Sequence, residues 1–232
     1  MTIKYISFDL DDTFWDVMPT IYKAEELTTA WIKENYPGTA KLMASENMTE
    51  VRKRIVQEDP SLQFQISKLR KKIFYDSSIL AGYNEEEARD MSENAFNVFI
   101  KGRNNVTLFE GVMDTLESLQ KKYSLGVITN GNADLKQIGM DHLFEHCFSS
   151  ADTHAHKPDP RAFEALINAT KLKPEEICHV GDHPINDVRG IYDCGMNPIW
   201  FKNPGAEWPL EDLKVPEFES WDTFESVLTA SY

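Results

Sequence analysis

The chain has 232 residues and 41% of them are hydrophobic, so it can bury a substantial core in one large or two modest domains. It carries 24 Lys and Arg against 38 Asp and Glu, and the net charge of −14 excludes a basic surface for nucleic acid. No stretch approaches the ~18–20 consecutive apolar residues of a membrane-spanning helix, so we expect no membrane partner.

The N-terminal segment predicts a short buried strand that ends in acidic residues. An apolar run up to residue 8 leads directly into Asp9, Asp11 and Asp12. Residues two apart in a strand point to the same side, so Asp9 and Asp11 are expected to project together. Because burial disfavours uncompensated carboxylates, we expect a divalent cation here, and hard oxygen ligands favour Mg²⁺. The alternative is an acidic loop that caps the next helix.

Residues 17–104 carry a helical pattern, and no strand pattern of comparable strength interrupts it. Between Trp15 and Asn105 there are 13 Lys and Arg against 14 Asp and Glu, whereas the rest of the chain has 11 against 24. Apolar residues recur at helical spacing in three stretches, which include Ile21, Ala24, Leu27, Trp31, then Ile66, Leu69, Ile73, and then Ala88, Met91, Ala95 and Phe99. We predict an inserted, nearly neutral helical domain.

The remainder of the chain alternates between helix and strand patterns. We expect strands near residues 125–129, 147–149, 177–180 and 198–201, and helices near 112–123, 134–140, 160–170 and 185–194. A short strand and a helix are expected after residue 203. This alternation is typical of an α/β fold with a Rossmann-like parallel sheet, helices on both faces and ligands at the carboxyl ends of the strands. We therefore assign residues 1–16 and 105–232 to the core and 17–104 to the insertion.

Further polar residues follow the later predicted strands and one loop. Singly, each has an ordinary explanation: Thr129 as a strand-end hydroxyl, Lys157 as a solvated charge in a proline-stiffened loop, and Asp187 as a residue favoured at a helix start. Together they lie where the carboxyl ends of a parallel sheet meet, so both acidic strand ends can share one cation. The candidates in this set are Thr129, Asn130, Gly131, Lys157, Asp182 and Asp187.

The order of these motifs resembles the haloacid dehalogenase (HAD) superfamily of phosphohydrolases. Asp-x-Asp-x-Thr starts at Asp9, Thr-Asn-Gly at Thr129, Lys-Pro at Lys157 and Gly-Asp-x-x-x-x-Asp at Gly181. The resemblance spans essentially the whole chain, and it implies a catalytic core with a helical cap that closes over the site and selects the substrate. Residues 8–13, 128–133 and 179–182 also resemble the bacterial branch that includes flavin-pathway phosphatases, which act on flavin mononucleotide or its phosphorylated precursor.

The resemblance implies a role for each motif residue in hydrolysis of a small-molecule phosphate ester. Asp9 is expected to be the nucleophile that forms an aspartyl-phosphate, and Asp11 the general acid and later the general base. Thr129, with the backbone amides around Asn130 and Gly131, is expected to bind phosphoryl oxygens, and Lys157 to add positive charge.

The resemblance also implies a set of Mg²⁺ ligands. Asp9, the backbone carbonyl of Asp11 and the side chain of Asp182 are expected to hold the ion, with Asp187 close behind. Thr13 is expected to bond within its own turn.

Other functions remain open at this point. A C–halogen hydrolase would need the nucleophilic Asp but no metal, and those enzymes typically lack the second Asp of the first motif. A catalytically silent binding protein and a phosphomutase share the fold or the motifs. In the insertion, a ring and positive charges at Phe64, Lys68 and residues 70–72 suit an aromatic phosphate ester, or else form an apolar face flanked by solvated lysines. The identity of the ester and the oligomeric state are left open.

Cysteine usage bears on the compartment. The three cysteines, Cys147, Cys178 and Cys194, are odd in number and widely spaced, and residues 1–8 show no basic and apolar regions of a signal peptide. We therefore expect reduced, buried cysteines and a cytoplasmic location.

Overall fold

A computed structural model of the chain describes residues 2–46 and 48–232, which fall into two compact units. The first, here the core unit, comprises Met1–Val17, Thr107–Gly131 and Ile138–Tyr232. The second, here the helical unit, comprises Met18–Val106 and Asn132–Gln137. Asn132–Gln137 thus group with the helical unit, although they directly follow the Thr-Asn-Gly motif in the chain.

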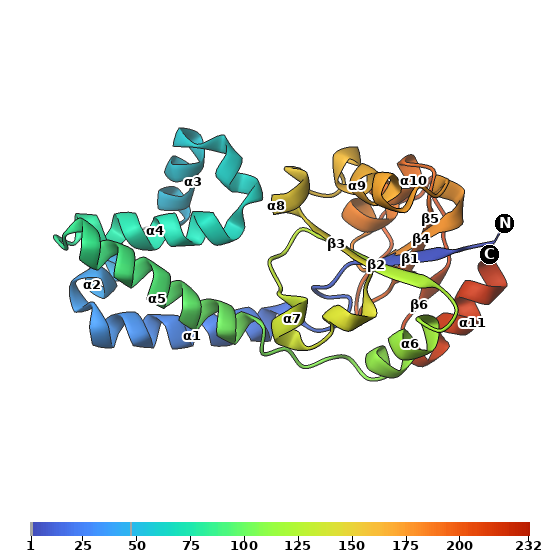
Figure 1. Cartoon of the computed structure of the whole chain (residues 1–232), viewed down its shortest axis with the longest axis horizontal. Coiled ribbons are helices and arrows are strands. Elements are labelled where there is room, and N and C mark those ends of the chain that lie inside the picture. Colours follow the sequence, from blue (N-terminus) through green and yellow to red (C-terminus); the bar gives the residue numbers. More distant parts are fainter. Residues whose placement is uncertain (1, 47) are drawn as a thin grey trace. The chain divides into compact units, whose positions relative to one another are not determined.

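The core unit is built on a sheet of six parallel strands in the order β3-β2-β1-β4-β5-β6 (Figure 1). Strand β1 is central and buried along its length, which explains why all of its residues except Ser7 carry apolar or aromatic side chains. The strands are β1 (Tyr5–Phe8), β2 (Ser124–Thr129), β3 (His146–Ser149), β4 (Ile177–Gly181), β5 (Asn197–Phe201) and β6 (Glu217–Phe218).

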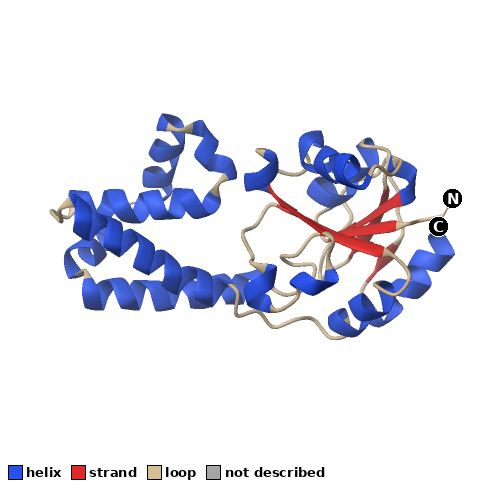
Figure 2. Cartoon of the chain, in the orientation of Figure 1, coloured by secondary structure: helices blue, strands red, loops and turns tan. Residues whose placement is uncertain are grey.

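Helices cover both faces of this sheet (Figure 2). The predicted α/β architecture with a Rossmann-like parallel sheet is therefore confirmed. The α-helices of the core unit are α6 (Val112–Leu119), α8 (Ser150–Thr153), α9 (Pro160–Thr170), α10 (Gly190–Asp193) and α11 (Trp221–Ser231), whereas α7 (Leu135–Ile138) begins within the segment that groups with the helical unit. Short helical turns are η2 (Asp141–Leu143), η3 (Pro174–Glu176) and η4 (Pro184–Arg189).

An aromatic cluster fixes the loop that follows β1. The ring of Phe14 packs 5.4 Å from Phe8 and 5.3 Å from Trp221, measured between centroids, and the indole of Trp221 donates a hydrogen bond to the carbonyl of Thr13. Phe8 and Phe14 are fully buried. Burying such large rings contributes roughly 2–3 kcal/mol each, so the acidic loop between them is held on a rigid base.

The helical unit has its own apolar core, formed by side chains that include Ala24, Phe74, Met91 and Phe99. Its longest helices are amphipathic, and α5 begins with a capping box in which Asn84 and Glu87 exchange hydrogen bonds. The unit contains α1 (Val17–Asn35), α2 (Pro37–Ser45), α3 (Met48–Glu58), η1 (Pro60–Phe64), α4 (Ile66–Leu80) and α5 (Glu85–Arg103).

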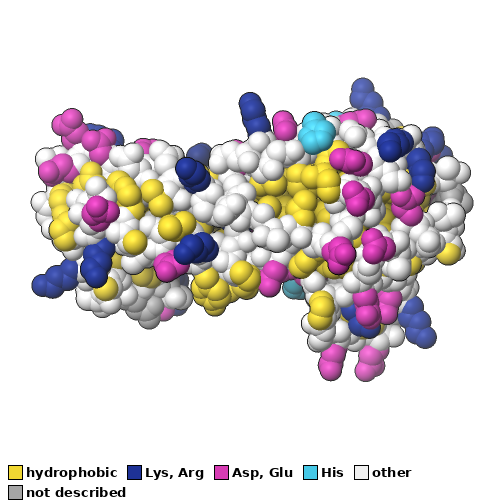
Figure 3. Space-filling model, turned by 90° about the horizontal axis from the view of Figure 1, so that it is seen from below, with side chains coloured by type: hydrophobic (Ala, Val, Ile, Leu, Met, Phe, Trp, Pro, Cys, Tyr) yellow, Lys and Arg dark blue, Asp and Glu magenta, His cyan; other side chains and the backbone are white. Residues whose placement is uncertain are grey.

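Figure 3 shows one face of the molecule, on which hydrophobic side chains lie among both acidic and basic ones. Exposed apolar residues of the helical unit include Tyr22, Leu27 and Leu80. Within the described part of the chain, we find no helix with the length and apolar character needed to span a bilayer.

Three local expectations need correction. The helix expected over 185–194 is split into a π-helical turn, η4, and a single α-helical turn, α10, because the amide of Val188 bonds to the carbonyl of His183, five residues earlier. The helix expected over 134–140 shrinks to α7, since Gly139 takes a left-handed φ of 89°. Cys147 is exposed because β3 is an edge strand, while Cys178 is buried.

Candidate active site

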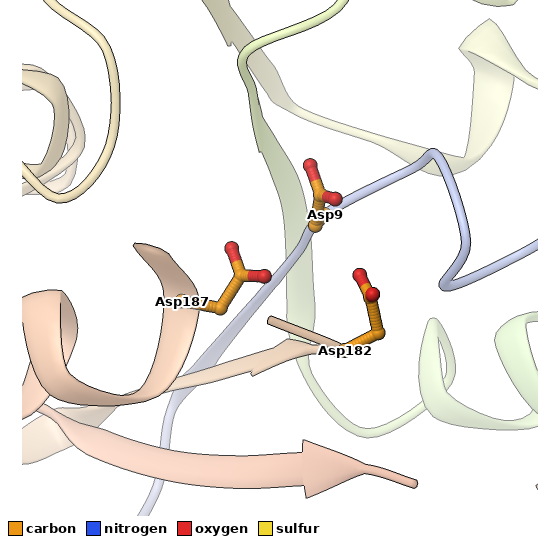
Figure 4. Close-up of side chains that lie close together, drawn as sticks. All are labelled: Asp9, Asp182 and Asp187. Carbon is orange, nitrogen blue, oxygen red and sulfur yellow. The ribbon is translucent and has the colours of Figure 1, made fainter. Parts of the chain in front are cut away.

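Three carboxylates converge at the carboxyl ends of β1 and β4. One oxygen of each of Asp9, Asp182 and Asp187 lies within 4.8 Å of the others. Figure 4 shows that the three side chains approach a common space from three separate segments of the chain. Asp9 and Asp187 are buried. The structure therefore brings together Asp9, Asp182 and Asp187, as expected from their positions after parallel strands.

The backbone dictates this convergence. The amide of Asp9 continues the ladder of β1 by donating to the carbonyl of Val180 at 2.9 Å, and Asp182 follows the last residue of β4. A Cβ atom placed on Gly181 would lie 2.3 Å from Cγ of Asp187. Because no real Cβ tolerates such an approach, glycine at position 181 is what allows Asp187 to pack against the strand end.

Lys157 forms the centre of the charge network. Its Nζ atom contacts Oδ1 of Asp9 at 2.7 Å and Oδ1 of Asp187 at 2.6 Å, and it donates to the carbonyl of Ile128 at 2.7 Å. These three acceptors match the three protons of an ammonium group. The side chain is only 2% exposed, so its position is fixed rather than solvated.

Asn130 holds the backbone of Lys157 from both sides. Its side-chain amide donates to the Lys157 carbonyl at 3.1 Å, and its Oδ1 atom accepts from the Lys157 amide at 2.8 Å. The backbone around Asn130 is expected to bind phosphoryl oxygens. In addition, the Asn130 side chain positions the backbone of Lys157. Residues 130 and 157 lie in separate loops, and no local sequence signal links them.

Thr129 and Gly131 are also joined. The amide of Gly131 donates to Oγ1 of Thr129 at 2.9 Å, so this amide is already engaged within the loop. Thr129 is 3% exposed, and because its Oγ1 atom accepts from Gly131, the proton of its hydroxyl is directed elsewhere. Both residues line the same small pocket as the three carboxylates.

Two contacts fix the acidic loop after β1. The indole Nε1 of Trp15 donates to Oδ1 of Asp11 at 2.9 Å, and the hydroxyl of Thr13 donates to Oδ1 of Asp182 at 3.2 Å. Thr13 thus reaches across to the second acidic strand end in addition to bonding in its own turn. Trp15 and Thr13 are fully buried, and sequence reasoning had given no partner role to Trp15.

The cluster perturbs the acidity of its members. Burial raises the pKa of Asp9 to about 7, although Lys157 acts in the opposite direction. Burial, followed by the charges of Asp187 and Asp9, raises the pKa of Asp182 to about 8. For Asp187, burial alone would raise the pKa, but Lys157 and His179 outweigh it and keep the pKa below its usual range. Burial would lower the pKa of Lys157, but Asp187 and Asp9 keep it above the usual range.

The same residues fit a divalent cation. Three carboxylates face the single ammonium group of Lys157, which leaves two negative charges when all are ionised. Burial, and after it the neighbouring carboxylates, raises the pKa of both Asp9 and Asp182. A doubly charged ion with oxygen ligands would remove this imbalance, and a carboxylate set of this kind suits a hard cation.

A pocket of about 170 Å³ opens over the cluster. It is lined by Asp9, Asp11, Asp12, Thr129, Asn130, Gly131, Lys157, Asp182, His183, Asn186 and Asp187. The lining includes every residue assigned from the sequence to catalysis, phosphoryl binding or the metal, whereas the candidates of the insertion, Phe64, Lys68 and residues 70–72, do not line it. The pocket is small and polar, which suits a compact charged group rather than a large organic molecule.

Comparison with known proteins relates the whole chain to one group of hydrolases. The sequence profile of a family described as haloacid dehalogenase-like hydrolase matches residues 3–195. A phosphatase from Escherichia coli (strain K12), 5-amino-6-(5-phospho-D-ribitylamino)uracil phosphatase YigB, is 28% identical over 200 residues, which cover 86% of this chain and 84% of that protein. The glyceraldehyde 3-phosphate phosphatase of Pyrococcus furiosus is 36% identical over 117 residues, about half of each chain.

A solved structure extends this similarity to the complete fold. The crystal structure of a protein described as 2-haloacid dehalogenase from Pseudomonas syringae pv. Tomato DC3000 superposes with a TM-score of 0.94 and 37% sequence identity, and the match covers 99% of both chains.

Proposed function

Since the chain belongs to the haloacid dehalogenase-like hydrolase family, we propose that it is a Mg²⁺-dependent phosphatase that hydrolyses small-molecule phosphomonoesters through an aspartyl-phosphate. One observation carries this proposal: the buried carboxylate of Asp9 is held by Lys157 beside two further carboxylates that lack a matching positive charge. Phosphoryl transfer needs such a nucleophile next to concentrated positive charge, and a cation at this cluster would supply it.

In the first half of the reaction, the carboxylate of Asp9 attacks phosphorus in line with the leaving alcohol. A bond forms between the Asp9 oxygen and phosphorus, and the bond from phosphorus to the alcohol oxygen breaks. Asp11, whose carboxyl group is oriented by the Trp15 indole, gives a proton to the departing oxygen. Thr129 donates to a phosphoryl oxygen, where negative charge develops, and the ammonium group of Lys157 adds positive charge beside it.

In the second half, water attacks phosphorus of the aspartyl-phosphate and Asp11 takes the proton that water loses. The bond to Asp9 breaks, so orthophosphate leaves and the carboxylate is regenerated. The role of Asp11 reverses between the two halves, as a single residue that is first acid and then base requires. Lys157 keeps its contacts to Asp9 and Asp187 throughout and prevents the nucleophile from rotating away.

We assign the Mg²⁺ ligands to the side chains of Asp9 and Asp182 and the backbone carbonyl of Asp11, with Asp187 behind them. When bound, the ion supplies charge neutralisation and orients a phosphoryl oxygen. Thr13 keeps Asp182 aimed at the cluster through its hydroxyl.

We further propose that residues 17–104 act as a cap and choose the substrate, and that the substrate belongs to flavin biosynthesis or turnover. The similarity to the E. coli uracil-derivative phosphatase supports this choice. Within the helical unit, a pocket of about 480 Å³ is lined by Arg52, Phe74, Phe99 and other largely apolar side chains. Arg70 lies 3.6 Å from the centre of the Phe99 ring and pairs with Glu25. A pocket with aromatic walls and a stacked guanidinium suits a planar ring with polar edges.

C–halogen hydrolysis is the second candidate, because the P. syringae protein of the same fold is described as a dehalogenase. The charges argue against it. A 2-haloacid is an anion and its hydrolysis needs no metal, so the excess negative charge of three carboxylates around one ammonium would remain and repel it, whereas a phosphomonoester would bind together with a neutralising cation. A C–halogen hydrolase also has no need of Asp11 as the general acid and base.

A phosphate-release screen tests the proposal. We expect orthophosphate from flavin mononucleotide or its phosphorylated ribitylamino-uracil precursor at rates above those for phosphoglycolate, nucleoside monophosphates and sugar phosphates. Activity should disappear with EDTA and return with Mg²⁺. A flat substrate profile would remove the flavin assignment, a rearranged phosphate ester would indicate a phosphomutase, and metal-independent chloride release from 2-chloropropionate would overturn the phosphatase assignment altogether.

A further inference from the structure

A buried histidine stands behind the reacting groups and has no role in the steps above. His179 lies on β4 directly opposite Ser7 on β1, and both are almost completely shielded from solvent. The ring packs edge-on to Phe163, with 6.0 Å between centroids. A polar ring at the centre of a parallel sheet is unfavourable unless its nitrogens are paired, so its bonds indicate what it does there.

Both ring nitrogens of His179 are paired. Nδ1 lies 2.8 Å from Oγ of Ser7, and Nε2 lies 3.3 Å from Oδ1 of Asp187. Asp187 already accepts from Nζ of Lys157 and from the amide of His183, which makes both of its oxygens acceptors. The hydrogen of the His179 ring must therefore sit on Nε2 and point at Asp187.

This assignment fixes the role of Ser7. With hydrogen on Nε2, Nδ1 is an acceptor, and the Ser7 hydroxyl donates to it. The alternative acceptor for that hydroxyl, the carbonyl of Cys178, lies at 3.4 Å and is a poorer partner. Ser7 thus selects one tautomer of His179, as a second partner commonly does for a functional imidazole.

We propose that Ser7 and His179 are positioning residues that hold Asp187, and through it Lys157, in place beside Asp9. The line of contacts runs from Ser7 through His179, Asp187 and Lys157 to Asp9. Oδ1 of Asp187 accepts from both Lys157 and His179. Without the imidazole, the Asp187 side chain can rotate about its torsions. The Lys157 ammonium, which is paired with Asp187, can then shift away from Asp9. The inference rests on the proposed roles of Asp9 and Lys157 in phosphoryl transfer.

Substitutions at position 179 test the Nδ1 contact and the Nε2 contact of the ring separately. Gln places an amide donor near the position of Nε2 and can reach Asp187, whereas Asn places its amide near Nδ1 and reaches only Ser7. Phe keeps an aromatic ring, somewhat larger than imidazole, and makes neither bond. We expect His179→Gln to retain kcat within about 3-fold, and His179→Asn and His179→Phe to lower kcat about 10–100-fold with KM changed less than about 3-fold.

Magnetic resonance provides readouts independent of turnover. In protein labelled with ¹⁵N-histidine, the His179 signals, identified by their absence in His179→Gln, should show a protonated Nε2 and an unprotonated Nδ1. Ser7→Ala should move them toward a mixture of tautomers. The Lys157 Nζ resonance should be protected from exchange in the unmodified protein and in His179→Gln, and lose that protection in His179→Asn.

Several results would overturn the proposal. A protonated Nδ1 in the unmodified protein contradicts the assigned bonds, and equal kcat values for the Gln and Asn variants contradict the role of the Asp187 contact. If His179→Phe fails to fold, the Gln and Asn pair still decides. A protein that hydrolyses no phosphomonoester but shows the expected His179 and Lys157 signals would defeat the proposed function and leave the positioning network intact.

Discussion

The core unit and the helical unit handle charge in opposite ways. In the core, three carboxylates and one ammonium lie together away from solvent, held by bonds to Thr13, His179 and Asn130. In the helical unit, ion pairs such as Lys71 with Glu93 are partly exposed and contribute little to stability. The core retains a buried acidic cluster that lowers its folding stability, because the proposed chemistry requires these groups. Among its described residues, the helical unit has no comparable cluster.

The two units also differ in what their pockets offer. The core pocket is about 170 Å³ and lined by polar groups, whereas the helical unit has one of about 480 Å³ with largely apolar walls. A phosphoryl group suits the first and an organic ring suits the second. If this division of labour is correct, changes in the core should remove turnover, and changes in the helical unit should alter only the preference among substrates.

The largest effect is expected from Asp9→Asn. Removing the nucleophile should lower kcat by about 10⁴-fold or more, because no other carboxylate replaces Asp9 in line with the substrate. The change can be followed with p-nitrophenyl phosphate, with far-UV circular dichroism as the test of folding. Asp212→Asn removes an exposed carboxylate that pairs with Arg189, and it should leave kcat unchanged. Residual activity above about 1% in a folded Asp9→Asn protein would contradict the role of Asp9 as the nucleophile and the assignment of turnover to the core unit.

Lys157→Met should have the next largest effect. We expect kcat to fall about 10²–10³-fold, since one preorganised positive charge beside the phosphoryl group is lost. Asp9 and Asp187 would be left buried without their partner, so the free energy of unfolding should also fall by about 3–5 kcal/mol. Urea unfolding at 25 °C measures the second effect.

The matched control for this lysine is Lys202→Met. Lys202 pairs with Glu219 at 2.7 Å, the same ion-pair distance as in the core, but on the surface. Its removal should change the free energy of unfolding by less than about 1 kcal/mol. Equal losses for the two lysines would mean that burial does not distinguish the core network.

Asp182→Asn should stabilise the protein in the absence of metal while abolishing its response to Mg²⁺. A carboxyl group whose pKa is higher in the folded protein than in the unfolded chain stabilises the fold at low pH, and that contribution is lost as the pH rises through the folded value. With the pKa of Asp182 raised from 3.8 to about 8, the metal-free protein should lose stability between those two pH values.

At pH 8 and without metal, we expect Asp182→Asn to melt about 4–8 °C above the unmodified protein, which corresponds to about 2 kcal/mol. Differential scanning fluorimetry with EDTA, repeated with Mg²⁺, measures both parts. The unmodified protein should gain stability on adding Mg²⁺ and the variant should gain almost none. A variant that melts below the unmodified protein at pH 8 would show that the Asp182 carboxylate does not destabilise the metal-free protein.

The smallest effect belongs to the helical unit. Arg70→Met removes the guanidinium from the Phe99 ring, so we expect kcat/KM for a flavin-pathway ester to fall about 3–10-fold, while kcat/KM for p-nitrophenyl phosphate changes less than 2-fold. Arg89→Met, at an exposed pair with Glu85, is the control and should change neither. Equal losses for both substrates would assign Arg70 a structural role instead.

The parallel sheet and the convergence of the acidic strand ends could both be predicted from the sequence. Buried parallel strands have uninterrupted apolar sequences, and their carboxyl ends meet at one edge whatever the details of packing. Asp9 and Asp182 could therefore be placed together although 172 residues separate them. The inserted helices were also readable, because their apolar residues recur at helical spacing.

The contacts that aim the reacting groups could not be read in the same way. The bonds from Asn130 to Lys157, from Trp15 to Asp11 and from Thr13 to Asp182 depend on side-chain directions that only the packed loops determine. Periodicity carries no information about such pairs. The π-helical turn after β4 could not be predicted either, because a single bond from the Val188 amide to the His183 carbonyl leaves no periodic signal in so short a segment.

The hydrogen bond from Trp15 to Asp11 has an optical consequence. Indole fluorescence responds to the charge next to its ring nitrogen, and in this protein that neighbour is the proposed acid–base carboxylate, 2.9 Å away and joined to a fully buried ring. Each proton that arrives at or leaves Asp11 should therefore alter the light that Trp15 emits. The Trp15 indole is therefore an intrinsic fluorescent probe beside the proposed acid–base group, so its emission should report proton transfer at Asp11 without labelling of the chain.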